Sequence, residues 1–148
     1  MRQARGVTSA DGPLVVGDGD DELDVRLGAE LTAYNTAASG SSDQRRLTVR
    51  VRDASGDLVA GLSGWTWGTS AGVSLLWVRA DERGAGWGAR LLAAAELEAR
   101  ARGCTQLTVS SFTFQAPGFY RRQGYAETAR TTGIPTAPHA DVHLRKEL

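Results

Sequence analysis

The chain has 148 residues, of which 17 are basic and 17 acidic, so its formal net charge is zero. That length suits one domain with a full hydrophobic core, and a zero net charge argues against binding nucleic acid or an anionic membrane through bulk charge. No apolar run approaches the roughly 20 residues of a membrane helix, and the first residues lack the apolar segment of a secretory signal. The chain has one cysteine, Cys104, so it cannot form an intramolecular disulfide, and a single thiol offers no metal site. We therefore expect a cytoplasmic, metal-free protein whose partners are small molecules or a second copy of the chain, as a homodimer.

The N-terminal part is the least regular. Residues 1–22 are rich in glycine and aspartate and show little periodicity, which predicts a flexible arm ahead of a single domain over residues 23–148. The alternating "LDVRL" at 23–27 favours a short strand, and 28–39 favours a short helix with Leu31 and Tyr34 on one face.

Three strands are predicted next. Residues 46–53 alternate strictly, with Leu47, Val49 and Val51 on one face, and 58–67 follow after a turn as the partner of a hairpin. The apolar "VSLLWV" at 73–78 has the character of a central strand. The pattern indicates three consecutive antiparallel strands.

The second half changes to alternating helix and strand. From Gly86 to Arg102 the period is helical, with Leu91, Leu92 and Ala95 on one face together with Ala99. A strand at 106–111, a short helix at 116–124 and a last strand at 141–148 complete an α/β chain.

A glycine-rich loop, "RGAGWG" at 83–88, joins the central strand to this helix. Backbone N–H groups at such a junction, together with the helix dipole, form an anion site. A P-loop is excluded because Gly88 is followed by Ala89 and Arg90 in place of Lys and Ser or Thr. Gly84, Gly86 and Ala89 match the dinucleotide fingerprint, but the carboxylate expected about 20 residues later is missing. A nucleotide-binding α/β domain stays as a less favoured alternative.

Two motifs carry a family resemblance. "RGAGWG" resembles the (Arg/Gln)-x-x-Gly-x-(Gly/Ala) signature of the GNAT superfamily of N-acetyltransferases, with Arg83 in the first position. "APGFYRRQGY" at 116–125 resembles the second family motif, in which Ala116, Tyr120 and Gly124 match together with Tyr125. The likeness extends over residues 23–148, and the ending "PHADVHLRKEL" is similar to a bacterial subgroup of mostly unassigned substrate. It implies a mixed, mainly antiparallel sheet of six to seven strands with a splayed central pair, flanked by three to four helices.

The resemblance also implies acetyl-CoA as the acyl donor. In this family the strand before the loop bulges and splays from its neighbour, the pantetheine arm follows its main chain, and the pyrophosphate lies on the loop. A backbone N–H near Val78 would polarise the thioester carbonyl. Thr113 replaces the usual Asn of the second motif, so Gln115 is expected to substitute. The cofactor-binding positions implied are Trp77, Val78, Arg79, Arg83, Gly84, Ala85, Gly86, Trp87, Gly88, Ala89 and Gln115.

For catalysis, the resemblance places Tyr120 as the general acid toward the sulfur of coenzyme A. The segment "GVSLLWV" has no carboxylate to deprotonate the amine, so water or another group must act as the base. His139 is the main side-chain candidate because histidine titrates near neutral pH, and His143 is interpreted as structural. The other candidates for the base are Glu82, Glu127 and Asp141.

The acceptor side is implied to include the tail loop at 131–141 and four further side chains, Tyr34, Asn35, Trp65 and Trp67. The function predicted is transfer of an acetyl group from acetyl-CoA to a primary amine of a small molecule such as an antibiotic or metabolite. The missing carboxylate motivates the alternative of a noncatalytic acyl-CoA-binding module.

Overall fold

The structure is a computed structural model that describes residues 12–148, so half of the predicted flexible arm, residues 1–11, lies outside the described residues. It divides into two compact units, one ending at Ser39 and one spanning Gly40–Leu148. No helix in the described part is long and apolar enough to cross a membrane.

The first unit contains one helix, α1 (Asp21–Ser39), whose side chains are all exposed or partly exposed. The strand predicted at 23–27 is therefore wrong. The reason is local: the Asp20 carboxylate accepts a hydrogen bond from the Leu23 N–H (2.9 Å) and so caps the helix. Acidic residues in the first turn, Asp21 among them, favour the positive end of the helix dipole. Leu23 and Leu27 are four residues apart, a spacing that puts them on one face of a strand and also on one face of a helix, so the pattern alone did not distinguish the two.

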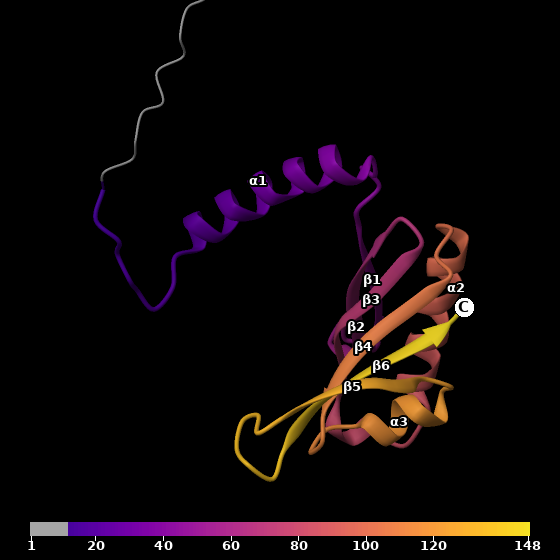
Figure 1. The fold of residues 1–148 in the computed structure, drawn as a ribbon. Helices are drawn as coiled ribbons and strands as arrows, with labels where there is room; N and C mark the ends of the chain where they lie inside the picture. Colours follow the sequence, from indigo (N-terminus) through magenta and orange to yellow (C-terminus); the bar gives the residue numbers. More distant parts are fainter. Residues whose placement is uncertain (1–11) are drawn as a thin grey trace, which may run out of the picture. The chain divides into compact units, whose positions relative to one another are not determined.

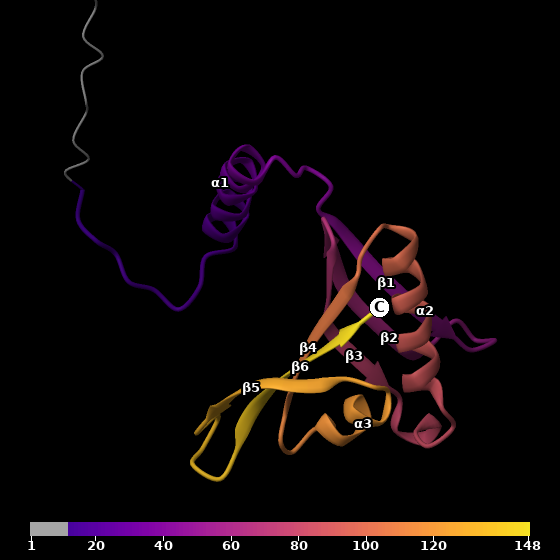
Figure 2. The same ribbon diagram turned by 45° about the vertical axis from the view of Figure 1, so that its right-hand side comes forward.

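The second unit is built on one six-stranded sheet with the order β1-β2-β3-β4-β6-β5 (Figures 1 and 2). The strands are β1 (Arg45–Arg52), β2 (Leu58–Trp67), β3 (Ser70–Val78), β4 (Gln106–Phe112), β5 (Ala126–Thr132) and β6 (Ala140–Glu147). Only β3 and β4 pair in parallel among the described strands; the other four pairings are antiparallel. The α/β, mainly antiparallel fold class is confirmed.

The helices of this unit are α2 (Trp87–Ala101) and α3 (Pro117–Arg122), preceded by a 3-10 turn, η1 (Ala80–Glu82). Together with α1, the described residues form three α-helices, at the lower end of the expected range. Strand β5 was not predicted, because all of its side chains are exposed and its sequence, "AETARTT", has no apolar alternation.

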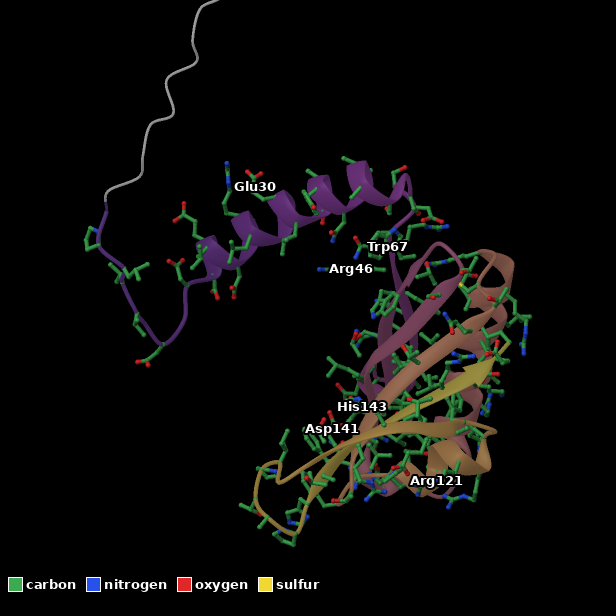
Figure 3. The ribbon with its side chains drawn as sticks, in the orientation of Figure 1. Glu30, Arg46, Trp67, Arg121, Asp141 and His143 are labelled. Atoms are coloured by element: carbon green, nitrogen blue, oxygen red, sulfur yellow. The ribbon has the colours of Figure 1, made fainter. Side chains whose placement is uncertain are left out.

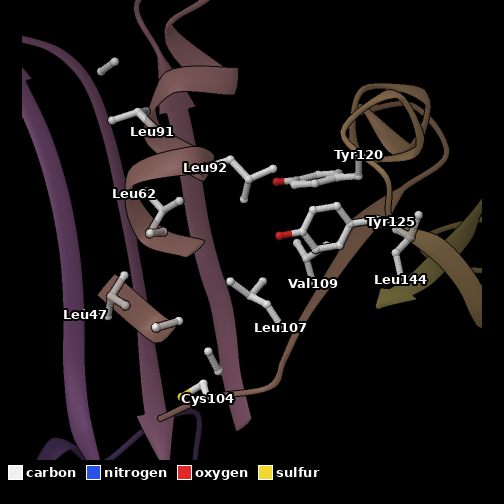
Figure 4. Close-up of a cluster of buried hydrophobic side chains, with 14 of the residues drawn as sticks. Leu47, Leu62, Leu91, Leu92, Cys104, Leu107, Val109, Tyr120, Tyr125 and Leu144 are labelled. Carbon is white, nitrogen blue, oxygen red and sulfur yellow. The ribbon is translucent and has the colours of Figure 1, made fainter. Parts of the chain in front are cut away.

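The hydrophobic core lies between α2 and the sheet (Figure 4). Leu91, Leu92, Ala95 and Ala99 are all buried, which confirms the predicted apolar face of α2. They pack with β-strand residues such as Leu47 and with Tyr120 from α3 in one cluster. At about 25 cal/mol per Å² of apolar surface, this cluster is the main source of the unit's stability.

The two central strands separate halfway along. The β3–β4 pairing runs only from Ser70 opposite Gln106 to Val73 opposite Val109, although both strands continue further. At the same place β3 bulges, because Val73 and Leu75 pair with consecutive residues of β2 and Ser74 is left over. The bulge and the splayed central pair that the resemblance implied are both confirmed.

Gly64 and Gly72 allow β2 and β3 to approach closely beside this bulge. A Cβ at Gly64 would collide with the main-chain carbonyl of Gly72, and a Cβ at Gly72 would collide with the Trp65 ring. The Trp65 indole therefore lies directly over Gly72.

Helix α3 is tied to β5 through the Glu127 carboxylate. Arg121 of α3 lies 2.6 Å from Glu127 Oε2, and Arg130 lies 2.9 Å from its Oε1. Hydrogen bonds from Arg130 and Arg121 lower the pKa of the Glu127 carboxyl to about 2.

We expect Gly64→Ala to destabilise the protein by about 2–3 kcal/mol, because the clash is with backbone and cannot be relieved by a rotamer change. The measurement is urea unfolding followed by circular dichroism. Gly61→Ala on the same strand is the matched control, since its Cβ would lie at an ordinary 3.7 Å from the Val49 carbonyl. Equal free energies of unfolding for the two variants would contradict the close approach.

We expect the Glu127 carboxyl to titrate near pH 2 in the folded protein. Its folded pKa is lowered, so the stabilisation is complete above roughly pH 4.3, the ordinary unfolded value, and is lost as the pH falls toward 2. Carboxyl-carbon NMR measures the midpoint. Arg130→Gln should raise it, whereas Arg145→Gln, which removes an arginine paired with Glu147, should leave it unchanged.

Candidate active site

A cleft of about 840 Å³ opens where β3 and β4 separate. Three segments line it: the outer half of β3, the loop and first turn of α2, and the connection from β4 into α3. The sequence-predicted residues that it brings together are Trp77, Val78, Glu82, Arg83, Gly84, Gly86, Trp87, Gly88, Ala89, Gln115 and Tyr120. Arg79, Ala85 and His139 are not among its lining residues.

The floor of the cleft is the N-terminus of α2. Gly84 and Gly86 have positive φ angles of 82° and 83°, which turn the chain into the helix without a side-chain cap. The first helical hydrogen bond runs from the Arg90 N–H to the Gly86 carbonyl (3.1 Å), so the earlier N–H groups have no partner within the helix. With no acidic residue in this first turn, the helix end can hold an anion.

Helix α3 packs against the first turn of α2 at Gly88. A Cβ there would lie 3.2 Å from the Phe119 ring, tighter than an ordinary contact. The second glycine of the family motif therefore allows the two cleft-lining helices to approach.

Arg83 and Trp87 lie at the loop. Arg83 Nε donates a hydrogen bond to the Val78 carbonyl (3.0 Å), and Trp87 Nε1 donates to Glu82 Oε2 (3.3 Å). The Arg90 guanidinium lies 4.1 Å from the centre of the Trp87 ring. These contacts hold two basic side chains beside the helix end.

Arg79, which directly follows β3, is held by several contacts. Its N–H donates to the Val59 carbonyl (2.8 Å), and its guanidinium contacts Asp53 (2.9 Å) and Asp81 (2.7 Å). Hydrogen bonds with Asp81 and then Asp53 raise the pKa of Arg79. The side chain thus fastens the end of β3 to the turn after β1.

Tyr120 reaches the cleft from α3 and is 6% exposed. Its ring meets Phe119 and Tyr125 edge to face, with centroid distances of 5.0 and 5.9 Å. Burial raises the pKa of the Tyr120 hydroxyl, so at neutral pH it is protonated and can donate a proton. Figure 4 shows its hydroxyl pointing toward Leu92 of α2.

A buried network of hydrogen bonds and an ion pair lies next to Tyr120 and was not predicted from the sequence. The Tyr125 hydroxyl donates to Glu96 Oε1 (2.9 Å), and Lys146 Nζ lies 2.9 Å from Glu96 Oε2. Burial and the Glu96 charge raise the pKa of Tyr125. The glutamate, 7% exposed, is balanced by the lysine, and the network links α2, the end of α3 and β6.

A second pocket, of about 280 Å³, is lined by residues of β2 to β6, among them Trp65, Ser110 and His143. Thr108, Ser110 and His143 alternate along their strands with the core residues Val109 and Leu144, so they lie on the sheet face away from α2.

The remaining predicted site residues lie outside both pockets. His139 meets the ring of Phe114, itself a lining residue of the cleft, at a centroid distance of 5.1 Å. Trp67 donates from Nε1 to the Ser41 carbonyl (3.3 Å), and Tyr34 and Asn35 are on α1. Within residues 12–148, no three His, Cys, Asp or Glu side chains gather into a metal site.

Comparisons with known proteins agree with this geometry. The family model described as "Acetyltransferase (GNAT) domain" matches residues 44–127. Blasticidin-S acetyltransferase of Streptomyces morookaense is 48% identical over 93 residues, which are 60% of this chain and 65% of that protein, slightly less than two thirds of it. An acetyltransferase of Agrobacterium fabrum is 36% identical over 108 residues, covering 73% of this chain and 79% of that protein.

Solved structures show the same architecture. A crystal structure from Agrobacterium tumefaciens, assigned as an acetyltransferase, superposes with a TM-score of 0.85 at 31% identity, covering 93% of this chain and 100% of the other. An aminoglycoside 6'-N-acetyltransferase complexed with coenzyme A shares the fold at 16% identity, with a TM-score of 0.63 over 90% of this chain and 97% of the other. The chain belongs to the GNAT family of acetyltransferases.

Proposed function

We propose that this protein transfers the acetyl group of acetyl-CoA to a primary amine of a small molecule, with an antibiotic as the favoured class of acceptor. The observation that carries the proposal is the large cleft between the separated strands β3 and β4, which ends at the uncapped N-terminus of α2. A long anionic ligand with an apolar arm matches this combination of a strand edge and a helix end.

The residues of the cleft fit coenzyme A in two parts. The N–H groups of Trp87, Gly88 and Ala89 would hold the pyrophosphate, with Arg83 adding positive charge. The backbone of Trp77 and Val78, unpaired with β4 in this half of the strand, would bond the pantetheine amides. Acetyl-CoA supplies the activated acetyl thioester.

Tyr120 would act as the general acid. The acceptor nitrogen forms a bond to the acetyl carbon, the C–S bond breaks, and the departing sulfur takes the proton of the Tyr120 hydroxyl. The protonated state that burial favours at this hydroxyl supports that role.

The acceptor class rests on the relatives and on the second pocket. The Streptomyces relative is named for an antibiotic, blasticidin S. Half-buried Trp65 gives the second pocket an aromatic wall, which suits a flat or cationic amine.

The test is a thiol-release assay with acetyl-CoA across a panel that contains blasticidin S, aminoglycosides, streptothricins, polyamines and an N-terminal peptide. We expect turnover with at least one small antibiotic amine and none with the peptide. Calorimetry with coenzyme A runs in parallel. Tight binding of coenzyme A with no turnover on any amine would instead favour a noncatalytic acyl-CoA-binding module.

We expect Tyr120→Phe to lower kcat by about 100-fold, with a small change in the KM for acetyl-CoA, because only the proton donor is lost. Tyr125→Phe is the matched control: it deletes the hydroxyl of the adjacent ring, which is bonded to Glu96, and should lower stability but not kcat. A Tyr120→Phe enzyme as active as the parent at every pH would remove the acid assignment.

A further inference from the structure

The second pocket contains a histidine that the sequence marked as structural. His143 lies on β6, directly opposite Ser110 of β4, and both side chains line the pocket with Trp65 and Thr128. Figure 3 shows His143 and Asp141 on the opposite side of the sheet from Arg121 of α3. The imidazole is therefore at the wall of a cavity, on the face that α2 leaves open.

The second pocket and the large cleft meet within the sheet. Val73, Val109 and Ser110 line both of them. Val73 and Val109 form the last pair before β3 and β4 separate. The two pockets therefore adjoin at the point where the strands separate.

The hydrogen bonding of His143 leaves one ring nitrogen for chemistry. Its Nε2 lies 3.2 Å from the Thr131 hydroxyl, which can accept the Nε2 proton. In that tautomer Nδ1 carries the lone pair and can accept a proton.

Two charged side chains flank His143 on its own strand. On β6 the charged side chains two positions away on the same face are Asp141 and Arg145, and Arg145 pairs with Glu147. One carboxylate oxygen of Asp141 is buried without a hydrogen-bond partner, which adds negative potential to this face. The neighbours from the flanking strands are uncharged: Thr108 and Ser110 on β4, and Ala129 and Thr131 on β5.

We propose that the second pocket holds the acceptor amine and that His143, in place of His139, is the base that removes its proton. This inference rests on the proposed acetyl transfer. As the nitrogen bonds to the acetyl carbon, its proton moves to Nδ1 of His143, while the C–S electron pair leaves with sulfur and the Tyr120 proton. The products are the amide and free coenzyme A, and solvent returns the proton from His143 to Tyr120. Thr131 is a positioning residue that holds the ring in the required tautomer.

The experiment measures acetylation of blasticidin S, or of the best amine from the panel if that is another compound, by the parent, His143→Ala and His139→Ala. We expect His143→Ala to lower kcat about 100-fold, and added imidazole to restore it about tenfold or more, since the small base can enter the vacated pocket. The parent with imidazole is the control for nonspecific effects. His143→Gln, which keeps a polar side chain but has no ring nitrogen to accept a proton, should lower kcat as His143→Ala does.

The outcomes separate the two proposals. Turnover by the parent together with an unimpaired His143→Ala, or with a loss that imidazole cannot restore in a folded variant, overturns the role of His143. A loss confined to His139→Ala and rescued by imidazole returns the base to His139. If the parent acetylates no amine, the proposed function fails and this inference with it. Circular dichroism of each variant establishes that it is folded.

Discussion

The early end of the β3–β4 pairing is the constraint on which the site depends. Parallel strands normally stay hydrogen-bonded along their length, because unpaired N–H and C=O groups are costly unless a ligand or water satisfies them. Here the ladder stops at Val73 and Val109, and the extra residue at Ser74 turns the end of β3 away. The close approach of β2 to β3 at Gly64 and the ion pairs of Arg79 hold the displaced strand in place. The cleft is therefore a consequence of rigid strand geometry, and no mobile loop is needed to form it.

Much of this arrangement could be predicted from the sequence. The strands around the hairpin, the apolar face of α2 and the glycine loop all have strong periodic or compositional signals. The separation of the two central strands was predicted from the resemblance to the family. Strand β5 could not be predicted, because an edge strand with every side chain exposed has no apolar alternation. The short helix predicted at 28–39 lies within α1, but residues 21–27 of this helix were missed although Asp20 and the acidic first turn gave a capping signal, because "LDVRL" fits both periods.

For the candidate site, the sequence motif predicted the main-chain positions of the glycine-rich loop, but it did not predict which side chains contact one another. Main-chain positions follow from a motif, because glycines at fixed spacing dictate backbone geometry. The contact of the Arg79 side chain with Asp53 was not predicted, because the two residues are distant in sequence and spacing alone could not associate them. The Glu96–Lys146–Tyr125 network could not be predicted for the same reason, because its members come from three segments that are distant in sequence. A buried ion pair of this kind is costly to desolvate, and here the hydrogen bond from Tyr125 adds to the pairing of Glu96 with Lys146.

The sharing of Val73, Val109 and Ser110 by two pockets on opposite faces of one sheet also bears on kinetics. Under the proposed assignment the acyl donor and the acceptor occupy separate, adjoining pockets, so both can be bound at once. Such an arrangement is suited to a direct transfer in a ternary complex, without an acyl-enzyme stage. It also indicates a shape for inhibition: a compound that joins both ligands would pass beside Val73, Val109 and Ser110, the residues that the two pockets share.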